Sequence, residues 1–135
     1  MEIPNLATIH AKDIDRIAKE QAKIFVLQDR LKTHQLRNVF SAIERMRSKT
    51  KAKPGKDQTI YQMVETDLIL LKPKIAYAAG RQKSVRNTFF PFVEAAIEAV
   101  VMNQENEKKV AALKNFFALM ESVVGYHKFF ESGQN

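Results

Sequence analysis

The pattern that most constrains the fold is a helical periodicity in the C-terminal part of the sequence. Apolar residues recur three or four positions apart over nearly five turns, a spacing that places them on one face of an α-helix. They are Val110, Leu113, Phe117, Met120 and Val124, and the next position on the same face is His127. We therefore predict a helix over roughly residues 106–130 that buries Phe117, Met120 and Val124, with His127 as a partly buried core histidine.

The rest of the sequence shows helical periodicity and no strand-and-turn pattern. Four further apolar stripes at helical spacing lie within residues 10–27, 36–46, 60–71 and 89–101. Residues 48–58 carry no large apolar side chain and include Pro54-Gly55, so they are predicted to form a solvated basic loop. These patterns predict a single domain, residues 1–135, folded as an all-α bundle of about five helices.

Four residues mark expected helix ends. Thr33 and Thr88 are suited to N-caps, because a threonine hydroxyl accepts a hydrogen bond from a free N–H of the first turn. Gly80 is suited to a C-cap, because glycine adopts the left-handed backbone conformation that often ends a helix. Pro73 is expected to end or kink the third helix and to open a new turn.

The composition indicates which cellular compartment suits this chain. The 135 residues include no cysteine, which excludes a disulfide framework and a thiolate metal site and suits a reducing compartment. The first six residues have neither the basic nor the apolar region of a signal peptide. No stretch approaches the ~20 apolar residues that cross a bilayer. We therefore expect a cytoplasmic protein with no membrane association.

The sequence contains no recognisable catalytic or metal-binding motif. His10, His34 and His127 lie far apart and have no metal-ligand spacing, and His34 is expected to be exposed. Glycine-rich phosphate loops, nucleophile elbows and zinc-protease motifs are also missing. We therefore expect no catalytic residue, no bound metal and no cofactor, and we favour binding or assembly over catalysis.

The positive charge is concentrated in the middle of the chain. The formal net charge is +7, and residues 33–86 contain twelve basic and only four acidic residues. Residues 87–135 contain four basic and six acidic residues. Charge gathered in one segment is a better sign of a polyanion-binding face than a high isoelectric point alone.

The candidate binding residues form three groups. Arg37 and Arg45 lie eight residues apart on the second predicted helix, about 80° around its axis, so they are expected to share one solvated flank. The second group, at and around the loop, is Arg47, Lys49, Lys51, Lys53 and Lys56. The third group is Lys72, Lys74, Arg81, Lys83 and Arg86. Such side chains neutralise phosphates without reading sequence, although a basic run is often only a solubility surface.

Within the third group, Lys74 and Arg81 are seven residues apart and share a helix face if the segment between them is helical. Tyr77 lies near that face. Two roles are open for Tyr77: its ring stacks on a base or sugar, or it is a core or rim residue that supports the fold.

Three sequence blocks together resemble the small-subunit family of type III-A CRISPR effector complexes. The first is Thr33-His-Gln-Leu-Arg-Asn-Val-Phe40, similar to the family's helix start with Gln-Leu-Arg. The second is Lys72-Pro-Lys-Ile-Ala-Tyr-Ala-Ala-Gly-Arg81, which is the most distinctive of the three. The third is Glu121-Ser-Val-Val-Gly-Tyr-His-Lys128, in which Gly125 stands where the family has alanine. From the first to the last, the blocks span residues 33–128, about 70% of the chain.

The resemblance implies a mostly helical, non-catalytic subunit of such an effector complex. Several copies would stack as an inner filament beside other subunits and hold guide RNA and target RNA through the sugar-phosphate backbone. By family position, Arg37, Lys74, Arg81 and Lys128 are the implied RNA contacts. The number of copies and the dimerisation of the free protein are left open.

Other functions also fit parts of the sequence. The main alternative is a helical adaptor or oligomerisation module whose basic face binds an acidic protein partner, without salt-dependent affinity for RNA. A helix-turn-helix DNA-binding protein would need a short turn between two helices, and the long loop at residues 48–58 argues against it.

Overall fold

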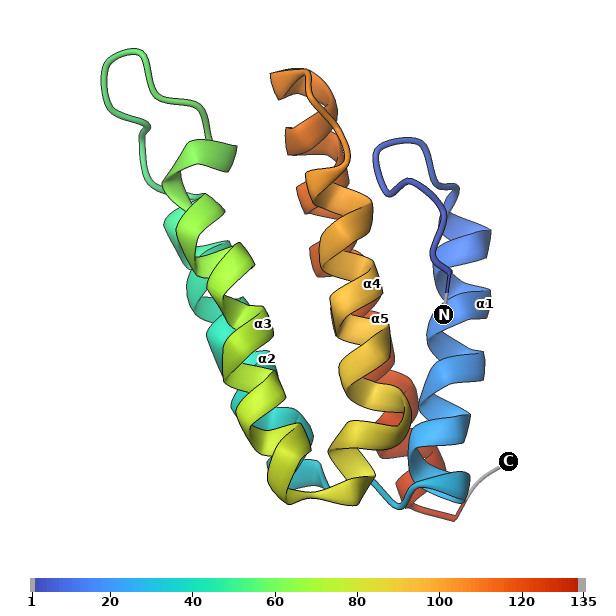
Figure 1. Cartoon of the computed structure of the whole chain (residues 1–135). Helices are drawn as coiled ribbons and strands as arrows, with labels where there is room; N and C mark the ends of the chain where they lie inside the picture. The colour runs from blue at the N-terminus through green and yellow to red at the C-terminus, as the bar shows by residue number, and fades with distance from the viewer. Residues whose placement is uncertain (1, 134–135) are drawn as a thin grey trace.

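The computed structural model describes residues 2–133 of the chain as a bundle of α-helices with no strand in that range (Figure 1). The helices are α1 (Ala11–Lys23), α2 (Thr33–Lys49), α3 (Glu65–Arg81), α4 (Phe90–Val101) and α5 (Asn106–Glu131). A π-helical turn, η1 (Ile24–Gln28), extends α1, and another, η3 (Val85–Phe89), leads into α4. A short 3-10 turn, η2 (Tyr61–Met63), precedes α3. The predicted all-α bundle of five helices is confirmed.

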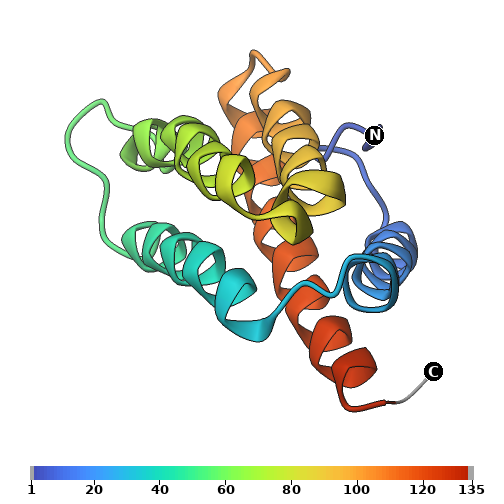
Figure 2. The ribbon, with the colours of Figure 1, turned by 60° about the horizontal axis from the view of Figure 1, so that its bottom comes forward.

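Helix α5 occupies the centre of the bundle. It contacts α1, α2 and α4, and the turned view shows it passing between α1 on one side and the α2–α3 pair on the other (Figure 2). Its buried residues are Ala112, Leu113, Phe116, Phe117, Leu119, Met120, Val123, His127 and Phe130. The predicted burial of Phe117 and Met120 is confirmed. Val124, also predicted to be buried, is only partly buried because it lines a hollow between α2 and α5.

His127 is a buried residue with a structural partner. Its side chain is 1% exposed, and its Nε2 lies 2.8 Å from the backbone oxygen of Leu31. Leu31 belongs to the short connection between η1 and α2, so this hydrogen bond joins that connection to the central helix. The prediction of a core histidine is confirmed, whereas His34 is exposed as expected.

The two π-helical turns meet in an aromatic cluster. The Phe25 ring packs edge-on against Phe89, with centroids 5.3 Å apart, and against Phe92, with centroids 5.5 Å apart. Beside them, the hydroxyl of Thr88 donates a hydrogen bond to the carboxylate of Asp29. Thr88 is therefore not the N-cap predicted for the fourth helix, because η3 carries helical backbone through it and leaves its hydroxyl free to bind another element.

The helix ends predicted at Thr33 and Gly80 are wrong, and of the two outcomes predicted at Pro73 the end of the helix is wrong. Thr33 is the first residue of α2 and not its cap; the preceding Lys32 N–H donates to Gln35 Oε1 over 2.9 Å. Gly80 is helical, and α3 ends one residue later, where Gln82 adopts extended backbone. Pro73 does not end α3, because it lies on the exposed face, where water can satisfy the Ile69 carbonyl that proline leaves without a donor.

The N-terminal segment packs against the end of the bundle near the α4–α5 connection. Leu6 is fully buried, its N–H donates to Ala99 O over 3.2 Å, and Asn115 Nδ2 donates to Leu6 O over 2.7 Å. The side chains of Asn5 and Asn103 exchange two hydrogen bonds of 3.0 and 2.9 Å. These contacts fix the segment against α4 and α5, a role that no pattern in the sequence indicated.

We predict that Phe25→Ala lowers the free energy of unfolding by about 3–5 kcal/mol, because it leaves a cavity between the two π-helical turns. Chemical denaturation in urea would measure the loss. Phe129→Ala is the control, since Phe129 is 45% exposed and its truncation should cost clearly less. If the two variants lose the same free energy of unfolding, the aromatic cluster does not contribute specially to stability.

Candidate nucleic-acid interface

Lys74, Tyr77 and Arg81 form an exposed stripe along α3. They are three and four residues apart on one helix, so their side chains leave the same face. Tyr77 is 70% exposed, and the Arg81 guanidinium lies 5.6 Å from its ring centroid and 3.4 Å from its hydroxyl. The shared face predicted for Lys74 and Arg81 is confirmed. The exposure of Tyr77 excludes a core position, while a stacking surface and a rim residue both stay predictions.

The same face of α3 also exposes apolar side chains that sequence reasoning missed. Ile69 is 40% exposed and Leu70 is 51% exposed, and both precede Pro73 on the solvent side of the helix. Leu68, Leu71 and Ile75 already supply the buried face. A helix with apolar residues on both faces is a sign that each face has a partner, and that signal was present in the sequence.

Arg45 joins this stripe from the neighbouring helix. A hollow of about 290 Å³ between α2 and α3 is lined by Arg45 and Lys74, together with His34 and Leu71. A smaller hollow of about 140 Å³ between the same two helices is also lined by Arg45 and Lys74. Two cations thus border both depressions, which is an arrangement suited to an extended anion such as a phosphate backbone.

Arg37 belongs to a different part of the surface. It lines a hollow of about 250 Å³ between α2 and α5, whose lining also includes Phe40, His127 and Lys128. Arg37 and Arg45 are both exposed on the solvated side of α2, as expected, but they do not border the same hollow. Helix α5 packs against one side of α2, and α3 packs against its other side. The two arginines therefore border separate depressions.

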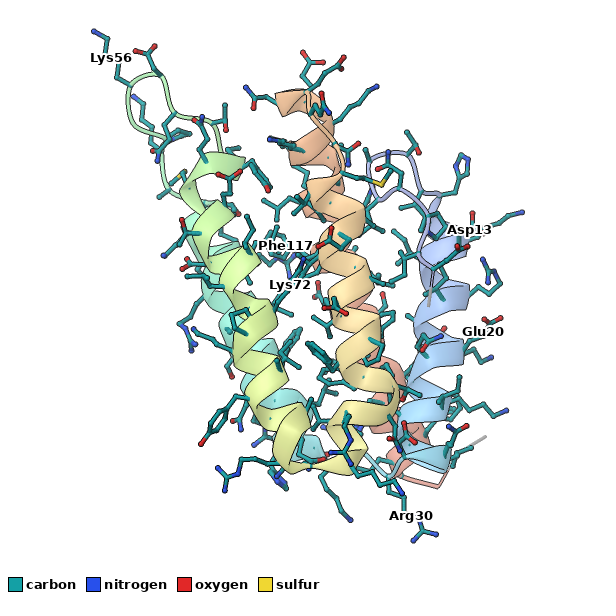
Figure 3. The ribbon with its side chains drawn as sticks, viewed as in Figure 1. Asp13, Glu20, Arg30, Lys56, Lys72 and Phe117 are labelled. Carbon is teal, nitrogen blue, oxygen red and sulfur yellow. The ribbon has the colours of Figure 1, made fainter. Side chains whose placement is uncertain are left out.

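Three of the predicted site residues are held in ion pairs within the molecule. Arg47 binds Glu121 on α5 over 2.8 Å, Lys49 binds Asp67 on α3 over 2.6 Å, and Lys72 reaches from α3 to Glu98 on α4 (Figure 3). Half-exposed pairs of this kind contribute only about 0–1 kcal/mol. The Arg47 and Lys72 pairs nevertheless connect the hairpin of α2 and α3 to α5 and α4, and the Lys49 pair joins the two helices of the hairpin. All three pairs leave these cations less available to a ligand.

The remaining predicted cations lie at the two ends of the hairpin. Lys51 and Lys53 are exposed in the loop between α2 and α3, which projects beyond the bundle with Lys56 near its tip (Figure 3). Lys83 and Arg86 are exposed at the opposite end, where η3 follows α3. The basic segment is therefore one hairpin, but its charges do not gather in one patch.

Two other tyrosines have shifted pKa values. Burial, followed by the nearby Glu65, raises the pKa of Tyr61. A hydrogen bond of 2.5 Å from the Tyr126 hydroxyl to Asp15 raises the pKa of Tyr126. Because the Tyr126 bond joins α5 to α1, it belongs to the packing of the bundle and not to the α2–α3 face.

Neither a cluster of metal ligands nor a membrane-spanning helix occurs among the described residues. Across residues 2–133, no group of three or more histidine, cysteine, aspartate or glutamate side chains is placed to hold a metal ion. No helix in the same range is long and apolar enough to cross a membrane.

Comparison with known proteins gives one consistent family. A family model described as Csm2 Type III-A matches residues 8–133. The curated protein "CRISPR system Cms protein Csm2" from Enterococcus italicus is 33% identical over 110 residues, which span 80% of this chain and 74% of that protein. No solved structure matches the chain.

We predict that neutralising the stripe leaves the fold intact. Lys74→Gln with Arg81→Gln should change the free energy of unfolding by less than about 1 kcal/mol, because both side chains are exposed and neither forms an ion pair within residues 2–133. Leu71→Ala on the same helix should cost about 2–5 kcal/mol. Thermal unfolding of the three proteins measures both effects, and a collapse of the double variant would make the stripe structural.

Proposed function

The chain belongs to the Csm2 family of type III-A CRISPR systems, and from this premise we propose that it holds RNA in a cytoplasmic effector complex. As a type III-A small subunit, it binds the sugar-phosphate backbone of guide RNA and target RNA without sequence preference. It does so in several copies, stacked as an inner filament beside the other subunits.

The observation that carries this proposal is the exposed stripe of Lys74, Tyr77 and Arg81 on α3, with Arg45 beside it. No acidic residue occurs between Asp67 and Glu94 in the sequence, so the stripe has no carboxylate on its own stretch of helix to neutralise it. The cations attract phosphates and release their counterions, while the exposed ring of Tyr77 offers a stacking surface.

This division of labour suits an RNA-guided complex. Base pairing between guide and target reads the sequence, so a protein subunit needs to recognise only charge and shape, as in RNA-guided effectors of another type. Lys83 and Arg86 extend the stripe beyond the end of α3, and Arg37 with Lys128 supply a second point of contact on the α2–α5 side. The paired cations Arg47, Lys49 and Lys72 contribute less.

Each copy provides few positive charges, so high affinity for RNA requires that several copies bind the same strand. When several weak sites are held in a row, binding to the second becomes intramolecular and the overall affinity rises steeply. The subunit needs no chemistry of its own for this role. We expect the purified protein to show no nuclease or nucleotide-hydrolysing activity.

The exposed apolar residues of α3 favour one second candidate function. Ile69 and Leu70 beside a basic stripe also suit an adaptor that binds an acidic protein surface. The two candidates differ in one measurable way, because an adaptor would show no salt-dependent affinity for RNA.

We predict that RNA binding depends on salt and ignores sequence. Two unrelated single-stranded RNAs of equal length, neither of them complementary to the guide, should bind the reconstituted effector equally, and the affinity should fall as salt rises. In the triple variant Arg45→Gln, Lys74→Gln, Arg81→Gln, the slope of log affinity against log salt should become shallower by about 0.7 for each phosphate that a copy no longer neutralises. Filter binding at several salt concentrations measures both quantities.

The matched control removes charge from another face. Lys12→Gln with Lys19→Gln neutralises two exposed lysines of α1, which lies on the far side of α5 from the hairpin (Figure 2). This variant should keep the wild-type salt slope. A strong preference for one RNA sequence, or equal effects of the two sets of substitutions, would count against the proposal.

We also predict that the ring of Tyr77 matters and its hydroxyl does not. Tyr77→Ala should weaken RNA binding by the equivalent of about 1–3 kcal/mol for each stacked base, whereas Tyr77→Phe should bind like the wild type. The same filter-binding assay at one salt concentration measures this. If both variants bind normally, Tyr77 does not stack on RNA.

A further inference from the structure

A wide groove lies on the face of the molecule formed by the N-terminal segment, α1 and α4. It has a volume of about 1050 Å³. Part of its wall is apolar, formed by Ile3, Ile17, Ala95, Ala99 and Met102, and Met102 is 59% exposed. Four carboxylates also line it: Glu2, Glu20, Glu94 and Glu98. An acidic, partly apolar groove of this size suits a cationic segment with long aliphatic side chains.

The groove keeps an unbalanced negative charge. Among the described residues that line it, the one cation is Arg16, which already lies 3.5 Å from Asp13 and 3.6 Å from Glu20. Glu98 is paired with Lys72 from α3. Glu94 is exposed and forms no ion pair within residues 2–133. At least one carboxylate therefore faces the groove without a partner.

A second and independent feature of the groove calls for a hydrogen-bond donor. Gln21 lines it and is only 9% exposed, yet its Oε1 atom is buried without a hydrogen-bond partner. An unsatisfied buried acceptor is costly, and native proteins contain few of them. A lysine ammonium inserted into the groove carries three donors and no acceptor, which matches the exposed carboxylates that line it. The Gln21 oxygen can accept one of these hydrogen bonds once its side chain turns toward the groove.

The chain itself carries a segment of the required chemistry. Lys51, Lys53 and Lys56 are exposed in the loop between α2 and α3, and none of them forms an ion pair in the part of the chain that is described. The loop projects at one side of the molecule, whereas Glu20 lies on α1 at the opposite side (Figure 3). Because the bundle separates them, the loop and the groove can meet only between two molecules.

We infer that the groove between α1 and α4 receives the α2–α3 loop of a second copy of this chain. The inference rests on the proposed function, in which copies stack, and it names the contact that joins them. A head-to-tail contact of this kind leaves one loop and one groove free at the ends, so further copies can be added without closure. In this arrangement Lys51, Lys53 and Lys56 contact the neighbouring copy, whereas the α3 stripe remains accessible to RNA.

Charge reversal tests the contact from both sides. The groove variant carries Glu20→Lys and Glu94→Lys, and it spares Glu98, which binds Lys72. The loop variant carries Lys51→Glu, Lys53→Glu and Lys56→Glu. Sedimentation of the full-length protein without RNA, at low salt and rising concentration, gives its self-association. The mass of the reconstituted effector gives the number of copies added.

Each variant alone should self-associate at least about tenfold more weakly than the wild type, because like charges then face each other. A mixture of the two should assemble again into longer chains in which the two variants alternate, because the reversed groove faces the reversed loop and the unchanged groove faces the unchanged loop. A chain that carries both sets of substitutions should regain wild-type assembly. Gln21→Leu should weaken assembly while raising the thermal midpoint of the free chain, because it removes the unsatisfied acceptor.

A matched control carries Glu44→Lys and Glu107→Lys, two acids outside the groove, and should assemble like the wild type. Three results would overturn the inference: a wild-type chain that stays monomeric both free and in the effector, failure of the doubly reversed chain to recover, or loss of the groove variant from the effector with no effect of the loop variant. The last result would indicate a basic segment of another subunit as the occupant.

The docking contact and the RNA role can fail independently of each other. If the variants assemble normally while RNA binding still depends on the α3 stripe, the RNA role stands and the docking contact is wrong. If assembly follows the charge swaps but no salt-dependent RNA binding is found, the contact stands and the RNA role fails.

Discussion

Helix α5 carries more buried residues than any other helix of the bundle, and the need to cover its buried face organises the rest of the structure. Its 26 residues include nine that are buried, and along the middle of the helix the exposed positions Lys114, Glu121, Gly125 and Lys128 lie on the opposite side. Burying a large apolar side chain contributes about 1.5–3 kcal/mol, so leaving such a helix half covered would be strongly unfavourable. Helices α1, α2 and α4 pack against it, and the His127 bond to Leu31 fixes the chain where it passes from α1 to α2.

The position of the basic hairpin follows from that arrangement. Because α2 packs on α5 and α3 packs on both α2 and α4, the outer face of α3 is left to solvent. The Arg47–Glu121 and Lys72–Glu98 pairs connect the hairpin to α5 and α4. Lys74, Tyr77 and Arg81 therefore stand on an uninterrupted helix, which holds their side chains at a fixed spacing along one line. A fixed line of cations is better suited to a regular phosphate backbone than the same charges on a mobile loop would be.

The two faces of the molecule have opposite chemistry. The hairpin carries most of the excess positive charge, while the groove between α1 and α4 is lined by four carboxylates. The role that we propose, repetition of the subunit along an RNA, requires one surface for the nucleic acid and two for the neighbouring copies. The separation of charge across this bundle meets that need, because the surface that attracts phosphate and the surface that repels it lie on different helices.

The amino-acid sequence by itself determined the helical class, the extent of α5, the burial of Phe117 and His127, the basic middle segment and the shared face of Lys74 and Arg81. The basic segment is a count of charges, and the other features follow from the spacing of residues along one helix. Both can be read from the sequence without knowing which helices pack together. Only the tertiary structure decided that Pro73 and Gly80 remain helical, that Thr88 binds Asp29, and that Arg37 and Arg45 border different hollows. The same holds for the ion pairs and the acidic groove, because both join residues that are far apart in the chain. Their formation depends on which helices pack together, and that is set by burial summed over the whole core.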